Sequence, residues 1–257
     1  MNSGNQFKFV ALEKLGGGST TSRYTFWNTI FSKLKPCLTN ELPINIKVIT
    51  ESGFQYTNIP IGNFIGKDIM ISGYFQSYKY FKDNYRKIIK IIDLENMKQT
   101  LLQKLNISKE SLSHSISMHF RIGDYKKLQH FHPLATYQYY ENSLMYIKNV
   151  MSEKFTIIYF CEEVNIEEVL ITIRKLQRKF PDFSFIRGNN TLEDWEQMLF
   201  MSICHHNIIA NSSFSWWSAY FNSNQDKLVL YPSVWFGLSA SKDTKDLCPT
   251  EWVKVQV

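Results

Sequence analysis

The stretch Asn207-Ile208-Ile209-Ala210-Asn211-Ser212-Ser213-Phe214-Ser215-Trp216-Trp217-Ser218-Ala219-Tyr220 decides the fold. Its mostly apolar beginning predicts a short buried strand, its small polar middle predicts a turn, and its aromatic end predicts a helix. Asn and Ser are favoured N-caps, so this turn leaves backbone N–H groups at the positive end of a helix dipole. Such a helix start is an anion site, typically for phosphate. The alternative is an ordinary capped helix with Trp216 and Trp217 in the core.

The residues around this stretch predict strands and helices in alternation. Working backwards, we expect helices at 192–204, 166–180 and 137–150, strands at 183–187, 155–161 and 115–120, and one further strand at 227–231. Alternation of this kind gives a parallel sheet covered by helices. In such sheets ligands bind beyond the carboxyl ends of the strands.

The first part of the chain has a different pattern. Prolines and a glycine run punctuate short apolar stretches there, which predicts strands and loops, and the apolar residues of 78–105 have helical spacing. We place a lobe boundary near Asn106-Ile107-Ser108. The predicted lobes are residues 1–107 and 108–257.

A second segment with unusual chemistry, SMHFRIGDYK at 117–126, closes the strand expected at 115–120. Arg121 carries a planar fork of donors that suits two phosphate oxygens at once. Gly123 stands where the backbone must turn or approach a ligand closely. The alternative is a surface ion pair between Arg121 and Asp124, which would stabilise the fold little.

Composition limits the class of protein. Hydrophobic residues make up 44% of the 257 residues and charged residues 20%, which suits a packed globule. The net charge of +6 suits an anionic partner, but the lysines are spread along the chain, so we expect a nucleotide diphosphate and no nucleic acid.

Neither a metal site nor a membrane span is expected. The sequence has no D-x-D pair and no C-x-x-C pair, which leaves no obvious metal-ligand spacing. No apolar run approaches the roughly 18 residues of a transmembrane helix, and the N-terminus does not resemble a signal peptide. We therefore expect a soluble, cytoplasmic protein without a transmembrane anchor, or one at the membrane periphery.

The two segments together resemble the motifs of the α-1,2-fucosyltransferases of glycosyltransferase family 11. Members of that family share H-x-R-R-G-D-Y and, further along, N-S-S-F-S-W-W-[SG]-A. This chain has HFRIGDY at 119–125 and NSSFSWWSA at 211–219. The likeness extends to SGYFQSYKYF at 72–81, to HPLATYQYYENSLMYI at 132–147 and to the segment 191–213, so it covers about residues 12–236.

The resemblance implies an α/β, GT-B-like fold with two facing Rossmann-like lobes, each with a parallel sheet. It implies inverting transfer of L-fucose from GDP-fucose to a galactose-terminated glycan acceptor, forming an α-1,2 linkage, with no cofactor and no divalent metal. Arg121 is then expected on the β-phosphate, Asp124 is expected to orient its neighbours, and His119 is expected to position Arg121 by a hydrogen bond. The expected donor-binding residues are Gly123, Asn211, Ser212, Ser213, Phe214, Ser215 and Trp216. The sequence identifies no base for the acceptor hydroxyl.

Two departures from the family pattern leave alternatives open. Ile122 stands where the family has a second arginine, which favours a nucleotide-sugar-binding protein without turnover. Gly4-Asn5-Gln6-Phe7 is the sole remnant of the family's glycine-rich first turn, so we expect an atypical or truncated N-terminus. A fucosyltransferase of another linkage is a further alternative, against which the NSSFSWW segment argues.

Overall fold

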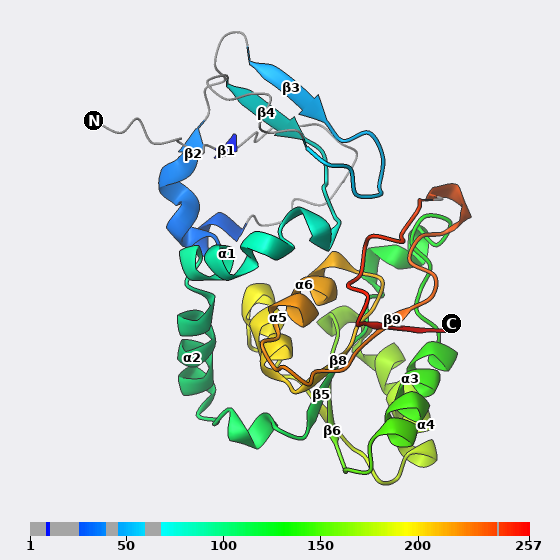
Figure 1. Cartoon of the computed structure of the whole chain (residues 1–257). Helices are drawn as coiled ribbons and strands as arrows, with labels where there is room; N and C mark the ends of the chain where they lie inside the picture. Colours follow the sequence, from blue (N-terminus) through cyan, green and yellow to red (C-terminus); the bar gives the residue numbers. More distant parts are fainter. Residues whose placement is uncertain (1–8, 11–25, 40–45, 60–67, 241) are drawn as a thin grey trace. The chain divides into compact units, whose positions relative to one another are not determined.

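The computed structural model describes residues 9–10, 26–39, 46–59, 68–240 and 242–257 (Figure 1). The expected N-terminal remnant at 4–7 and the glycine run at 16–18 lie outside the described residues. The chain divides into two compact units, residues 1–95 with 245–247 and residues 96–244 with 248–257.

The described part of the first unit holds two small parallel pairs of strands. Strand β1 (Phe9–Val10) pairs with β2 (Leu38–Thr39), and β3 (Lys47–Thr50) pairs with β4 (Ile69–Ser72). Strands and loops are what the prolines of this part of the sequence predict. Segment 245–247 belongs here because Asp246 accepts from Lys79 Nζ at 2.5 Å and from the backbone N–H of Tyr56 at 3.1 Å.

The helical spacing of 78–105 corresponds to two α-helices. Helix α1 (Tyr85–Ile91) and helix α2 (Leu94–Leu105) are separated at Asp93, which has a φ of 61°. That left-handed backbone conformation cannot continue a right-handed helix. The apolar periodicity therefore predicts the helices but not the break between them.

The second unit contains a six-stranded parallel sheet in the order β10-β9-β8-β5-β6-β7. The strands are β5 (Ser115–His119), β6 (Thr156–Phe160), β7 (Ser184–Arg187), β8 (His206–Ile208), β9 (Val229–Pro232) and β10 (Val253–Val255). The helices between them are α3 (Tyr137–Val150), α4 (Ile166–Lys179), α5 (Asp194–Ile203) and α6 (Ser213–Phe221). In Figure 1, α3 and α4 lie on one face of the sheet and α5 and α6 on the other. The mixed α/β, GT-B-like fold class that the sequence predicts is confirmed.

Strand β5 shows why both faces of this sheet are covered. Ile116, Met118 and Phe120 belong to the hydrophobic core cluster shared with α3 and α4. Ser115, Ser117 and His119 alternate with them and are equally buried, because successive strand residues point to opposite faces. Strands buried on both faces are typical of parallel sheets covered by helices.

Helix α2 is fixed to the second unit by two lysines. Lys98 Nζ donates to the backbone oxygen of Phe221, at the end of α6, at 2.6 Å. Lys104 Nζ lies 2.5 Å from Glu196 Oε1, and Glu196 also closes the capping box at the start of α5. The division between the units lies between Glu95 and Asn96, in the first turn of α2.

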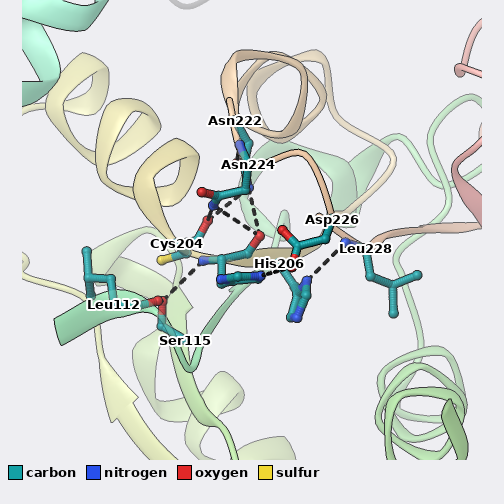
Figure 2. Close-up of polar contacts among 9 residues, drawn as sticks. Leu112, Ser115, Cys204, His206, Asn222, Asn224, Asp226 and Leu228 are labelled. Atoms are coloured by element: carbon teal, nitrogen blue, oxygen red, sulfur yellow. Dashed lines mark hydrogen bonds and ion pairs between the residues drawn. The ribbon is translucent and has the colours of Figure 1, made fainter. Parts of the chain in front are cut away.

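A polar network joins β5, β8 and α6 at the amino ends of the strands (Figure 2). Asn222 donates from Nδ2 to the backbone oxygens of Cys204 and His205 and to Asn207 Oδ1, over 2.8 to 3.1 Å. His206 Nδ1 accepts from the backbone N–H of Leu228 at 3.0 Å, and His206 is 3% exposed. Because these buried polar groups satisfy one another, the network fixes the register of β8.

None of the helices in the described ranges is long and apolar enough to cross a membrane.

Candidate active site

The sheet of the second unit reverses its strand order between β5 and β8. From β5 the chain adds β6 and then β7 on one side, and it then returns to add β8 and β9 on the other side. In open α/β sheets, ligands bind at this switch point, outside the carboxyl ends of the strands. The HFRIGDY segment leaves the carboxyl end of β5, and the NSSFSWWSA segment leaves that of β8. Both sequence motifs therefore meet at the switch point.

Arg121 follows β5 and is held by two carboxylates. Its guanidinium donates from one terminal nitrogen to Asp124 and from the other to Glu162, and its side chain is 17% exposed. Its Cζ atom also lies 5.1 Å from the centre of the Tyr125 ring. Asp124, in the same motif, and Glu162, which follows β6, thus both contact Arg121.

Gly123 allows Glu162 to approach the backbone closely. A Cβ atom at position 123 would lie 2.3 Å from Glu162 Oε2, and the backbone N–H of Gly123 donates to Asn165 Oδ1 at 3.0 Å. The neighbouring Ile122 packs against the hydrophobic core cluster. The side chain at position 122, where the family has a second arginine, therefore faces the core in this chain.

His119 does not position Arg121 by a hydrogen bond, contrary to the sequence-based expectation. It is 7% exposed, its Nδ1 has no partner among the described residues, and its ring centre lies 5.5 Å from that of Phe214. Burial lowers the pKa of His119 to about 3, and the positive charge of Arg121 adds to that effect. His119 is consequently a neutral imidazole at the end of β5, while the carboxylates position Arg121.

The start of α6 is a serine-capped helix N-terminus. Ser212 is the N-cap, and its Oγ accepts from the backbone N–H of Phe214 at 3.3 Å. Ser213 is exposed at the first helical position. Ser215 is fully buried, and its hydroxyl contacts the backbone oxygens of Ala210 and Ser212 at 3.4 Å. In this arrangement Ser213 presents its hydroxyl to solvent, and Ser215 uses its hydroxyl inside the turn.

Asn211 connects the two motifs and the loops beside them. Its Nδ2 donates to the backbone oxygens of Pro133 at 2.8 Å and Trp235 at 3.1 Å. Its backbone oxygen accepts from the Tyr125 hydroxyl at 3.2 Å. Asn211 is 2% exposed, and its Oδ1 has no partner among the residues described. Two buried polar atoms, this Oδ1 and the Nδ1 of His119, thus remain unpaired at the same edge of the sheet, which is a common sign of a ligand site.

Trp216 lies in the interior. It is 4% exposed, stacks on Tyr220 with ring centres 4.8 Å apart and lies 5.4 Å from Trp252. Phe214 is half-buried beside His119. Of the two aromatic residues assigned to donor binding, Phe214 is therefore nearer the surface.

The sequence analysis misses several residues at this edge. Glu162, Asn165 and Tyr125 each contact a predicted site residue, and Arg187 at the end of β7 pairs with Glu163 at 2.5 Å. The signal in the sequence is Glu162-Glu163 directly after the strand expected at 155–161. Within the described ranges, no three His, Cys, Asp or Glu residues lie together so as to hold a metal ion.

The sequence matches the model of the family described as "Glycosyl transferase family 11" over residues 34–256. It is similar to the Escherichia coli "O-antigen biosynthesis glycosyltransferase WbnK", with 31% identity over 180 residues, 67% of this chain and 57% of that protein. It is also similar to an Escherichia coli "Alpha-1,2-colitosyltransferase", with 29% identity over 206 residues, 79% of this chain and 67% of that protein. The matched part of the chain spans little more than half of the first relative's length.

Proposed function

The chain belongs to glycosyl transferase family 11, and on that premise we propose that it transfers L-fucose from GDP-fucose to a hydroxyl of a galactose-terminated glycan. The proposed reaction inverts the anomeric centre and forms an α-1,2 linkage. The observation that carries the proposal is the meeting of both family motifs at the switch point of one sheet. There Arg121 and the start of α6 supply positive charge for a diphosphate, beside two unpaired buried polar atoms.

The proposed chemistry is displacement at the anomeric carbon with GDP as the leaving group. Negative charge then grows on the β-phosphate in the transition state, where fixed donors are worth most. Arg121 and the first-turn N–H groups of α6 are proposed to stabilise that charge, with the Ser213 hydroxyl beside them. We propose that these groups neutralise the diphosphate without a divalent metal.

Donor choice is tested by thermal stability in a buffer that contains EDTA. GDP-fucose and GDP are expected to raise the melting temperature, because a bound ligand at about 100 times its Kd adds about 2.7 kcal/mol of stability. UDP-galactose is the control and is expected to leave the melting temperature unchanged. Equal shifts with both nucleotides, or a shift that needs added Mn²⁺, would contradict the proposed donor site.

Colitosyl transfer is a second candidate function, because one relative is named as an α-1,2-colitosyltransferase. Colitose is the 3-deoxy form of L-fucose, so both donors would share the nucleotide and differ at one hydroxyl. Competition between GDP-fucose and GDP-colitose for one acceptor, read by mass spectrometry of the product, distinguishes the two. Binding without turnover is a third alternative, favoured by Ile122, and it predicts no product from either donor.

Glu162 is expected to compete with the diphosphate for Arg121. A phosphate that takes two guanidinium nitrogens must replace one carboxylate, and Glu162 has a side chain that is 45% exposed. Glu162→Gln is therefore expected to tighten GDP binding by a factor of about 5, the size of one exposed ion pair. Titration calorimetry measures the change.

Glu163→Gln is the matched control for this variant. Glu163 is the next residue, but it pairs with Arg187 and not with Arg121. It is expected to leave the Kd for GDP unchanged. Weaker GDP binding in Glu162→Gln alone would show that Glu162 supports the arginine more than it competes for it.

A further inference from the structure

His132 lies on the loop between β5 and α3, at the carboxyl edge of the sheet. Its ring stacks on that of Tyr125, with ring centres 4.8 Å apart and planes 20° apart, and lies 5.7 Å from that of Phe236. Its backbone N–H donates to the oxygen of Leu128 at 2.7 Å. The imidazole is therefore held in place by ring contacts and by its backbone. Among the described residues, no protein group forms a hydrogen bond with its ring nitrogens.

Tyr125 connects His132 with both motifs. Its ring centre lies 5.1 Å from Arg121 Cζ, and its hydroxyl donates to the backbone oxygen of Asn211. The distance from the His132 ring centre to Arg121 Cζ is therefore at most the sum of the His132–Tyr125 and Tyr125–Arg121 distances. A sugar phosphate that is bound to Arg121 through its phosphate extends over about that distance. His132 is therefore close enough to Arg121 to contact the sugar end of a donor whose phosphate is held there.

The other titratable groups at this edge are less suited to accept a proton. Asp124 and Glu162 each already accept an N–H group from Arg121. His119 is fully buried with a pKa of about 3, so it does not take up a proton at neutral pH. His132 is only partly buried, and its ring nitrogens have no hydrogen-bond partner among the described residues.

We propose that His132 is the catalytic base that takes the proton from the acceptor hydroxyl, an inference that rests on the proposed function. As the acceptor oxygen bonds to the anomeric carbon, its O–H bond breaks and a ring nitrogen of His132 receives the proton. The bond between the anomeric carbon and the β-phosphate oxygen breaks with its electron pair, which leaves with GDP. The imidazolium then returns the proton to water.

The charges around His132 suit this role. Partial burial lowers its pKa, Asp124 opposes that effect, and the positive charges of Lys242 and Arg121 add to it. Tyr125 and Phe236 are the rings that pack against it. A lowered pKa keeps the imidazole neutral at neutral pH, which is the form that accepts a proton. As pH falls below the pKa of His132, protonation removes the base, so kcat/KM is expected to fall on an acid limb.

His132→Gln tests the proposal with GDP-fucose as donor and lactose as acceptor. It keeps a polar side chain of similar size but cannot act as a base. We expect kcat to fall by about 100-fold or more, the KM for GDP-fucose to stay within a factor of about 3, and the acid limb of kcat/KM to disappear. His130→Gln, two residues away and exposed, is the matched control and is expected to keep the parent rate and the parent pH profile.

The measurements separate failure of this proposal from failure of the proposed function. A parent protein that forms no fucosylated product overturns the proposed function and with it the role of His132. A parent that transfers fucose, with a His132→Gln variant that keeps its rate or its acid limb, overturns the base alone. Loss of GDP binding in His132→Gln, seen as a missing thermal shift, would assign His132 to packing and also overturn the base.

Discussion

Replacement of Arg121 by lysine is expected to lower the turnover of sugar transfer by about 100-fold or more, while the protein stays folded. Lysine keeps the positive charge but loses the planar fork that holds two phosphate oxygens. Removal of one preorganised donor at a developing anion typically costs about 3 kcal/mol of transition-state stabilisation. In the structure both terminal nitrogens of Arg121 are engaged, one by Asp124 and one by Glu162, so the fork is already oriented. Steady-state rates, with circular dichroism of both proteins, measure the effect.

Arg187→Lys is the matched control. Arg187 ends β7, two strands away from β5, and its guanidinium pairs with the carboxylate of Glu163. Like Arg121, Arg187 lies at the carboxyl edge of the sheet and is ion-paired, but it does not lie at the switch point. The Arg187→Lys variant is therefore expected to keep the parent rate. Near-equal rates for Arg121→Lys and the parent, in two folded proteins, would reduce Arg121 to a structural ion pair.

The sheet of the second unit was predictable because its residues alternate strongly between strand and helix patterns. The helix expected at 137–150 matches α3 (Tyr137–Val150), whose Thr136 N-cap and buried apolar face are both visible in the sequence. Strand β10 (Val253–Val255) was not predicted, because three residues carry too little pattern. The break between α1 and α2 was not predicted either, because a positive φ at Asp93 leaves no trace in apolar periodicity.

The candidate site was predictable where one segment supplies the chemistry. The Arg121–Asp124 contact lies within one motif, and the capped start of α6 lies within the other. Glu162 was not predictable, because its contact with Arg121 depends on β6 lying beside β5. The inward hydroxyl of Ser215 and the core-facing side chain of Ile122 follow from local packing, which residue types alone do not reveal.

Acidification from pH 7 to pH 5 is expected to lower the free energy of unfolding by about 4 kcal/mol. Burial lowers the pKa of His206 to about 4 and that of His119 to about 3, from an ordinary value near 6.5. At a pH above the ordinary pKa, a histidine whose folded-state pKa is lowered makes its full contribution to stability. This contribution is lost as the pH falls from the ordinary pKa toward the folded-state pKa. Each histidine therefore removes about 2 kcal/mol by pH 5, at about 1.4 kcal/mol per pH unit.

The window from pH 6.5 to about pH 5 separates the histidines from the ion-paired carboxylates, because the pKa values of Glu141 and Glu163 are lowered from 4.5 and their contribution is lost below that pH. His206→Asn tests the assignment, because the Asn oxygen can accept from the backbone N–H of Leu228, as His206 Nδ1 does, but does not titrate. Its unfolding free energy, from urea titrations at several pH values, should fall about half as steeply as that of the parent. His130→Asn is the control, because His130 is exposed, and it should keep the parent slope. If the unfolding free energy of the parent did not change between pH 7 and pH 5, then burial would not lower the folded-state pKa of either histidine.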